Sequence, residues 1–96
     1  MILVRAVFQA KLGKAQELVA SFKTAMQQSD TPNQSRILTD LSGPWDTVVV
    51  ETVAESLADW ERQRAEMFAN PQFQASFAQV SNLVVSGRNE YFTIET

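Results

Sequence analysis

The chain has 96 residues, a length that suits one domain with a single core, so we expect one domain over residues 1–96. Hydrophobic residues make up 45% of the chain and charged residues 20%, which is typical of a globular protein and not of a disordered one. The net charge is −3, and the eight Lys and Arg residues are scattered. Because nucleic-acid binding needs clustered basic residues to neutralise phosphates, we expect no nucleic-acid partner.

The chain contains neither cysteine nor histidine. The first absence excludes disulfides, thiolate nucleophiles and zinc–sulfur sites, and the second removes the commonest general base and transition-metal ligand. No spacing of carboxylates favours a metal either, so we expect no metal and no cofactor. The N-terminus does not resemble a signal peptide, and no apolar run approaches the roughly 20 residues of a membrane helix. We therefore expect a cytoplasmic protein without a membrane partner.

The first third of the chain predicts a strand followed by a helix. Residues 2–10 are rich in β-branched and aromatic side chains and present one wholly apolar face, which is typical of a central strand. Gly13 can cap a helix, and from Lys14 onward the apolar residues recur at the spacing of an amphipathic helix. We expect this helix to fade through residues 29–31, because Pro32 disfavours its continuation.

The middle of the chain predicts an antiparallel hairpin, which we expect at the centre of the sheet. Residues 34–41 and 46–53 alternate as strands do, and the turn at residues 42–44 contains Gly and Pro. Alternate residues of the second strand fall on opposite faces, namely Val48, Val50 and Thr52 on one, and Val49, Glu51 and Val53 on the other.

The last part of the chain predicts a helix in two pieces and a final strand. Ser56 and Asp59 form a capping-box analogue, and Asn70-Pro71 restarts the helix, which we expect to end near Leu83. Ser86-Gly87 predicts a break before a last strand over residues 89–95. The expected buried stripe of the first piece is Leu57, Trp60, Arg64, Met67 and Phe68, and Phe73 and Phe77 are expected core of the second.

The order of these elements predicts an α+β fold, a ferredoxin-like βαββαβ domain with a four-stranded antiparallel sheet and its helices on one face. The opposite face would carry one of the two valine sets of the hairpin, which is too apolar to lie comfortably in water. We therefore expect a homodimer in which sheet packs on sheet.

The chain resembles the dimeric α+β barrel superfamily, and within it the NIPSNAP-like proteins. The residues that carry the resemblance are Gly13-Lys14, the turn and strand from Gly43 to Glu51, Ser56-Leu57 with Trp60, Asn70-Pro71-Gln72-Phe73, and Ser86 to Tyr91. The resemblance implies a small homodimeric protein of unassigned activity. Relatives in the superfamily also include cofactor-independent monooxygenases and isomerases, and haem-degrading monooxygenases. The haem-degrading branch normally offers iron a histidine, which this chain lacks.

Two pairs of residues are candidates for a ligand site. Trp60 and Arg64 lie one helical turn apart, so they could bind an aromatic or anionic ligand between sheet and helices. The structural alternative, which we favour, makes Trp60 core and leaves the head of Arg64 in water. Arg5 and Glu51 are charges within apolar strands; they could pair across the sheet or the dimer interface, or lie at an exposed edge, or Glu51 could serve as a general base.

Two further aromatic residues complete the candidate set. Trp45 follows the turn and suits the rim of a cleft or a dimer contact. Tyr91 could offer its hydroxyl to a ligand, although a tyrosine satisfied by the backbone is commoner. Two hypotheses remain: a NIPSNAP-like module that binds a small ligand or none, and a cofactor-independent monooxygenase or isomerase of the antibiotic-biosynthesis type, which needs only positioning and electrostatic stabilisation.

Overall fold

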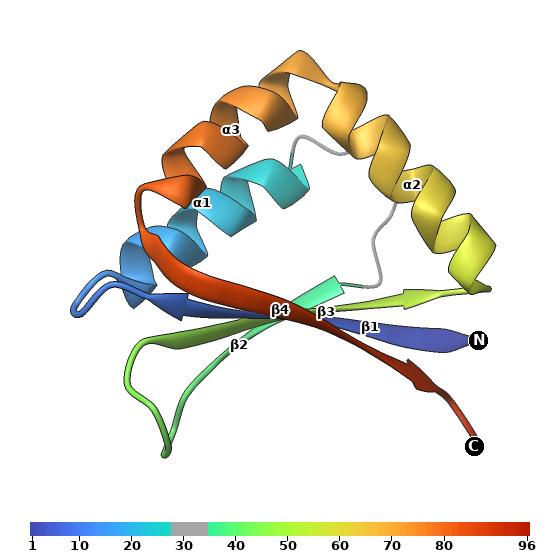
Figure 1. Cartoon of the computed structure of the whole chain (residues 1–96), viewed down its shortest axis with the longest axis horizontal. Coiled ribbons are helices and arrows are strands. Elements are labelled where there is room, and N and C mark those ends of the chain that lie inside the picture. Colours follow the sequence, from blue (N-terminus) through green and yellow to red (C-terminus); the bar gives the residue numbers. More distant parts are fainter. Residues whose placement is uncertain (28–34) are drawn as a thin grey trace.

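The computed structural model describes residues 1–27 and 35–96. The elements run β-α-β-β-α-α-β, which confirms the predicted ferredoxin-like α+β fold (Figure 1). Their bounds are β1 Ile2–Ala10, α1 Ala15–Gln27, β2 Ser35–Thr39, β3 Thr47–Ala54, α2 Leu57–Ala69, α3 Pro71–Ser81 and β4 Val84–Thr93. The predicted end of the first helix at residues 29–31 and the predicted strand start at Gln34 lie outside the described residues.

The four strands form one sheet in the order β2-β3-β1-β4, and every neighbouring pair is antiparallel. Strand β1 is central, as its apolar sequence predicted, and it pairs with both β3 and β4. The predicted hairpin is formed by β2 and β3, but only β3 lies at the centre of the sheet, and β2 lies at its edge. Strand β2 is at the edge because the other side of β3 pairs with β1, and β4 pairs with the far side of β1.

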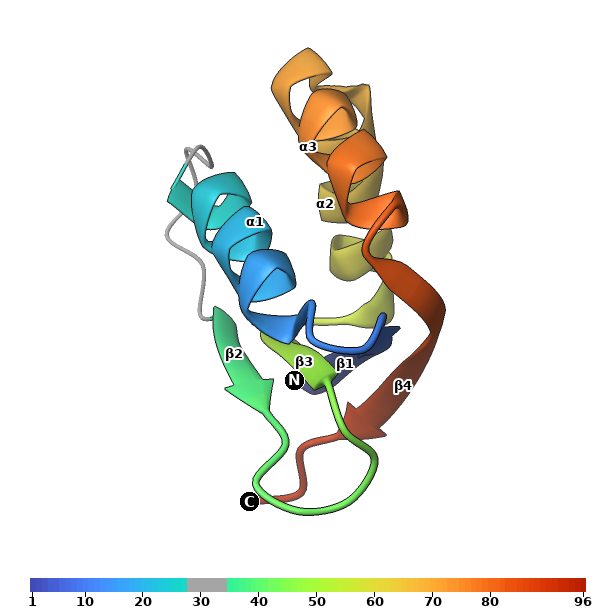
Figure 2. The ribbon, with the colours of Figure 1, turned by 90° about the vertical axis from the view of Figure 1, so that its left-hand side faces the viewer.

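All three helices lie on one face of the sheet, and Figure 2 shows the opposite face without a helix. We call these the helix face and the open face. The core lies where α1 covers the sheet: Leu18 and Val48 have no exposed surface, and the rings of Phe8 and Phe22 lie 5.0 Å apart between their centroids. Strand β3 presents Val48 to the helices and Val49 to the open face, as the alternation predicted.

The start of helix α1 is held by hydrogen bonds to a loop that is distant in the sequence. The carboxylate of Asp46, in the β2–β3 loop, accepts hydrogen bonds from the backbone N–H of Gly13 at 2.9 Å and of Ala15 at 3.4 Å. Gly13 has φ of 78° and is therefore a turn residue that only glycine adopts easily, and the capping oxygen comes from Asp46. Asp46 itself has φ of 60°, a conformation that Asp tolerates better than most residues.

Helix α2 departs from the prediction, because none of its residues is buried. Leu57, Met67 and Phe68, from the expected buried stripe, are 49%, 37% and 38% exposed. The reason is that α2 rises away from the sheet before α3 returns toward it, so its stripe has little sheet to cover (Figures 1 and 2). Phe77, expected in the core, is 45% exposed, and Phe73 is half-buried.

Strand β4 begins at Val84, five residues earlier than predicted, and continues through Ser86-Gly87 without a break. Gly87 pairs with Phe8 of β1, and a Cβ at Gly87 would lie 3.3 Å from the Phe8 ring. The glycine therefore makes room for a neighbouring ring, which is another use of glycine within strands besides marking a break.

Candidate functional site

The open face carries a row of alternating charges that crosses the whole sheet. Arg36 of β2 is in register with Glu51 of β3, Glu51 with Arg5 of β1, and Arg5 with Glu90 of β4. Residues in register on neighbouring antiparallel strands point to the same face, so the four side chains lie side by side. We call them the charged row; its signs run plus, minus, plus, minus from β2 to β4.

Ion pairs connect all four members of the charged row. Arg36 contacts Glu51 Oε1 through Nε at 2.7 Å and Nη2 at 2.6 Å. Arg5 Nε lies 3.0 Å from Glu51 Oε2, and Arg5 Nη1 donates to Glu90 Oε1 at 3.3 Å. Arg88, two residues before Glu90 on β4, donates from Nε to Glu90 Oε2 at 2.9 Å. Each glutamate is thus held by two arginines.

Glu51 is the buried member of this network, with 6% of its surface exposed. A buried carboxylate is costly unless it is paired and hydrogen-bonded, and the two flanking arginines meet that need. The pairing of Arg5 with Glu51 that the sequence suggested is therefore present within one sheet. Arg5 Nε lies close to Glu51 but is not directed at it, and this buried donor has no hydrogen-bond partner within residues 1–27 and 35–96.

Apolar side chains flank the charged row on both sides. Toward one end of the strands lie Leu38, Val49 and Val7, in register with one another, and toward the other lie Val53, Leu3 and Phe92. A shallow open groove of about 280 Å³ runs beside the row, lined by Leu3, Ser35, Arg36, Glu51 and Val53. Mainly apolar side chains therefore lie on both sides of the charged row, with Arg88 of β4 beside Val7, and Val7 and Val49 are already buried within the chain.

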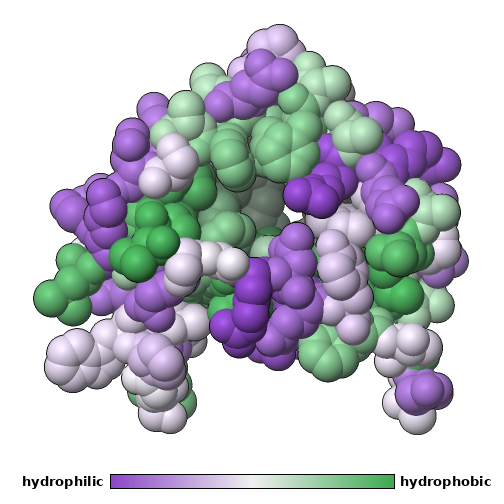
Figure 3. All heavy atoms as spheres, viewed as in Figure 1, coloured by the Kyte–Doolittle hydropathy of each residue, from purple (hydrophilic) through white to green (hydrophobic). Residues whose placement is uncertain are grey.

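Trp60 is the candidate that the structure places on the helix side. Asp59 and Trp60 are the two half-buried residues of α2, so Trp60 is the large apolar side chain through which the first turns of the helix approach the rest of the chain. Its indole Nε1 is buried and has no acceptor in the part of the chain that the structure describes. Figure 3 shows hydrophobic residues exposed over α2 and α3 around a recess between the helices and the sheet.

Three of the remaining candidates, Arg64, Tyr91 and Trp45, are more exposed to solvent than Trp60. The Arg64 side chain is exposed, with its guanidinium 5.4 Å from the centroid of the Phe68 ring. Tyr91 lies on β4, in register with Val4, and is 46% exposed. Trp45 lies in the β2–β3 loop, is 75% exposed and accepts a hydrogen bond from Gln9 at its carbonyl. Of the six candidates, only Arg5 and Glu51 are seen in contact.

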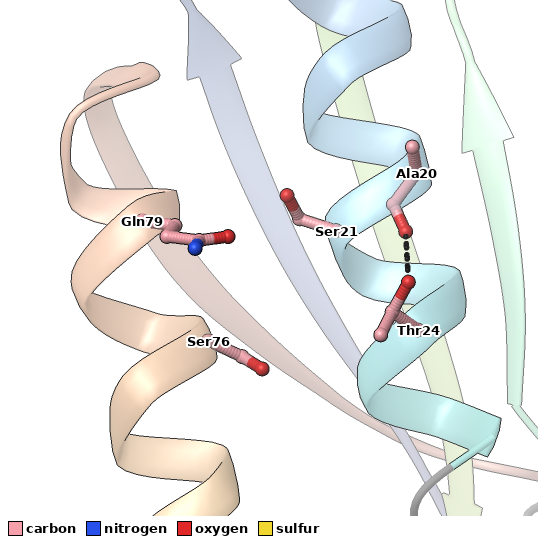
Figure 4. Close-up of a pocket in the computed structure, with 5 residues that line it drawn as sticks. All are labelled: Ala20, Ser21, Thr24, Ser76 and Gln79. Carbon is pink, nitrogen blue, oxygen red and sulfur yellow. Dashed lines mark hydrogen bonds between the residues drawn. The ribbon is translucent and has the colours of Figure 1, made fainter.

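A second hollow lies between α1 and α3, away from every candidate residue. It has a volume of about 180 Å³ and is lined by Ala20, Ser21, Thr24, Ser76 and Gln79. Figure 4 shows the side chains of Ser21, Ser76 and Gln79 pointing into the gap between the two helices, while the Thr24 hydroxyl donates to the Ala20 carbonyl at 3.0 Å. The hollow is small, polar and open.

Two kinds of site are not found in the described residues. No cluster of three or more acidic side chains there could hold a metal ion. No helix in residues 1–27 and 35–96 has the length and apolar character needed to cross a membrane.

Sequence reasoning missed three members of the network, Arg36, Glu90 and Arg88. Arg36 and Arg88–Glu90 are separated from Arg5 by more than thirty positions, and only the strand register brings them together. The hairpin indicates that the two strands pair, but counting outward from the centre of the 42–44 turn places Arg36 opposite Val50, whereas the observed register places it opposite Glu51. Asp46 was also missed, because a cap supplied from a distant loop leaves no local pattern.

Similar folds occur in solved structures. No family model matches the chain, and no curated protein matches it. An uncharacterised NIPSNAP-domain protein from Burkholderia xenovorans is 18% identical, with 100% of this chain and 96% of that one covered and a TM-score of 0.86. A NIPSNAP-family protein from Agrobacterium tumefaciens is 21% identical, with 98% and 86% covered and a TM-score of 0.84.

Solved structures outside the NIPSNAP group share the fold too. A candidate antibiotic biosynthesis monooxygenase from Chloroflexus aurantiacus is 15% identical, with 99% of this chain and 94% of that one covered and a TM-score of 0.74. The chain therefore has the ferredoxin-like α+β fold that these NIPSNAP-domain and monooxygenase-like structures share. At these identities the likeness establishes the fold and no activity.

Proposed function

We propose that this chain is a homodimeric module of the NIPSNAP type that binds a small aromatic molecule carrying oxygen acceptors, between α2 and the sheet. The main observation in favour of a ligand is that the buried Nε1 of Trp60 has no acceptor among the described residues. A buried donor without a partner costs free energy that a ligand oxygen would recover. An indole also offers a flat apolar surface for an aromatic ring.

The exposed inner stripe of α2 supports the same proposal. Leu57, Met67 and Phe68 leave large apolar surface in water, which is unfavourable unless something covers it. An aromatic ligand of ordinary size would cover part of this stripe while its oxygen accepts from Trp60. The binding energy would then come from apolar contact, and the indole N–H would fix the orientation.

The dimer is supported by the open face. Short domains bury a modest fraction of their surface, and Leu3, Val53 and Phe92 beside the charged row keep exposed apolar surface that another sheet could bury. Light scattering at micromolar concentration should give twice the chain mass of 10.7 kDa. A mass of one chain would remove the dimer from the proposal and leave the ligand site to be judged alone.

The ligand site is tested by tryptophan fluorescence. The chain has two tryptophans, so a Trp45→Phe variant leaves Trp60 as the sole reporter. We expect saturable quenching of Trp60 by members of a panel of hydroxylated aromatic acids and quinones, with a matching rise in melting temperature. The matched control is Trp60→Phe with Trp45 retained, followed by melting temperature; it keeps an aromatic ring, loses the N–H and should bind about two- to tenfold more weakly, as loss of one hydrogen bond predicts.

No change in fluorescence or in melting temperature with any compound of the panel at millimolar concentrations would contradict ligand binding.

The second candidate function, cofactor-independent oxygenation, is favoured by one observation, the fold shared with the Chloroflexus protein. Arg64 and Tyr91 are exposed, and the carboxylate of Glu51 lies on the opposite face between two arginines, so no base lies beside Trp60 among these candidates. Oxygen uptake with any compound that binds, absent in Trp60→Phe, would favour the enzyme.

A further inference from the structure

The two faces of the sheet differ in charge. All charged residues of the four described strands point to the open face, namely Arg5, Arg36, Glu51, Arg88 and Glu90. Side chains alternate along a strand, so the residues between them point to the helix face. Val48 and Phe8 of that face lie in or against the core beneath α1. On the described strands the helix face therefore carries no charged side chain.

The middle of the helix face is incompletely covered. Val48 and Val4, on either side of the middle, are 0% and 1% exposed. Val50 and Ala6, in register between them, are only half-buried, and Asn89, next in the same row on β4, is exposed. Figure 3 shows a recess between the helices and the sheet. The half-buried row makes Val50, Ala6 and Asn89 candidates for the floor of that recess.

Strand β4 contributes the polar groups of this part of the helix face. Asn89 and Tyr91 are two positions apart, so both point to the helix face, and Tyr91 is in register with Val4. Tyr91 is 46% exposed and Asn89 is exposed, so the amide and the hydroxyl are open to a ligand.

Trp60 lies toward the same end of the sheet as Tyr91. Helix α2 begins two residues after β3 ends at Ala54, and Trp60 is in its first turns. Ala54 is in register with Ile2 of β1, and Ile2 with Thr93, two positions beyond Tyr91 on β4. The start of α2 and the Tyr91 end of β4 are therefore neighbours in the fold.

We propose that Asn89 and Tyr91 are specificity-determining residues of the Trp60 site, and that this site takes an uncharged aromatic compound bearing carbonyl or hydroxyl oxygens. This inference rests on the ligand site proposed above and adds the charge of the ligand and its contacts on the sheet. The indole N–H, the tyrosine O–H and the asparagine amide can all donate to a neutral oxygen.

An ionised ligand is disfavoured by the same surroundings. A carboxylate in the recess would lose its hydration above a sheet face that offers no cation, which is costly. An acid could instead keep its carboxylate in water beside Arg64, whose exposed guanidinium lies over the Phe68 ring. Its carboxylate would then not satisfy the buried Nε1 of Trp60, so the acid should bind more weakly than a neutral compound.

Three compounds of similar shape test this preference. Naphthoquinone is neutral and carries two carbonyl oxygens, naphthalene carries none, and naphthoate is anionic. Isothermal titration calorimetry gives the dissociation constant of each with the wild-type chain. We expect naphthoquinone to bind at least about tenfold more tightly than the other two, because its oxygens accept hydrogen bonds and it brings no charge.

Variants of β4 test the two residues. Tyr91→Phe and Asn89→Leu should each weaken naphthoquinone binding about two- to tenfold and leave naphthalene binding undiminished. A change of fold or shape would weaken both compounds, so naphthalene separates lost hydrogen bonds from lost structure. Arg88→Gln, beside Asn89 but on the open face, is the matched control and should leave both dissociation constants unchanged. Circular dichroism shows whether each variant folds, and Asn89→Ala replaces Asn89→Leu if the larger side chain does not.

The contrary outcomes separate this inference from the site itself. Naphthoate that binds as tightly as naphthoquinone, or naphthoquinone binding that is undiminished in either β4 variant, would overturn the inference. If Trp60→Phe still weakens binding in that case, the site proposed above stands without it. Naphthoquinone that does not bind at all would also overturn the inference, and the wider panel of aromatic compounds would then decide whether there is a site.

Discussion

Helices α1 and α2 occupy equivalent places in the two halves of the fold, and they pack very differently. Each follows a strand and carries apolar residues at helical spacing. In α1, Ala15, Leu18 and Val19 are buried, whereas α2 buries no residue. The same pattern in sequence thus gives a core helix in one half and a largely exposed helix in the other.

The difference lies in how each helix is anchored. Helix α1 is held at its start by the Asp46 carboxylate from the β2–β3 loop, and the backbone N–H of Lys11 just before it donates to Leu83 at 2.8 Å. Helix α2 has a local cap, in which Ser56 accepts from the N–H of Asp59 at 3.1 Å. A local cap begins a helix but does not hold it against a sheet, so periodicity alone does not determine burial.

The largest expected effect is in the core beneath α1. Leu18→Ala removes a side chain with no exposed surface and should lower the free energy of unfolding by about 3–5 kcal/mol, as the lost burial and the cavity predict. Met67→Ala is the matched change in α2, where 37% of the residue is exposed, and should stay within about 1 kcal/mol of wild type.

Urea denaturation followed by circular dichroism measures both variants. The comparison between the helices fails if the two losses are equal, because α2 would then be packed as tightly as α1. A large loss in Met67→Ala that grows with protein concentration would instead place that residue in contact with another copy.

The second effect concerns the cap of α1. Asp46→Ala removes the acceptor for the N–H groups of Gly13, in the turn before α1, and of Ala15, at its first position, and places alanine at φ of 60°, so we expect a loss of about 2–3 kcal/mol. Asp46→Gly loses the acceptor but accepts the backbone conformation, and its loss should be smaller by about 1 kcal/mol. Ser56→Ala, at the local cap of α2, should cost about 1 kcal/mol.

Thermal and urea denaturation of the three cap variants decide their order. Equal losses in Asp46→Ala and Asp46→Gly would show that the positive φ stores no strain. A Ser56→Ala loss greater than that of Asp46→Ala would contradict the view that the distant cap is the stronger anchor.

The fold was predictable because most of its elements are encoded locally. Alternation in β1 and β3, the turn at residues 42–44 and the restart at Asn70-Pro71 each specify structure within a few residues. The misjudged elements depend on distant contacts. Gly87 suggested a break because its reason, the Phe8 ring, lies almost eighty positions away.

The candidate site was predictable only in part, for the same reason. Arg5 and Glu51 attracted notice as charges within apolar strands, and the structure places them in contact. Their further partners Arg36 and Glu90 lie in strands that contain other polar residues, so a charged residue there gives no signal in the sequence. Strand register is a property of the folded sheet, so a row across four strands could not be read from any one of them.

The smallest expected effect concerns Arg64 on α2. Its guanidinium lies over the Phe68 ring in an exposed position, and such contacts contribute about 0.5–1 kcal/mol. Arg64→Gln should lower the free energy of unfolding by no more than that, while Arg64→Lys, which retains the cation, should lose less. A loss above about 2 kcal/mol in Arg64→Gln would mean that α2 is held by this residue and is not the loosely packed partner of α1. If Arg64→Gln leaves stability unchanged but weakens the binding of anionic aromatic compounds, Arg64 belongs to the ligand site together with Trp60. The exposed residues of α2 would then bind a ligand, whereas the buried residues of α1 only form the core.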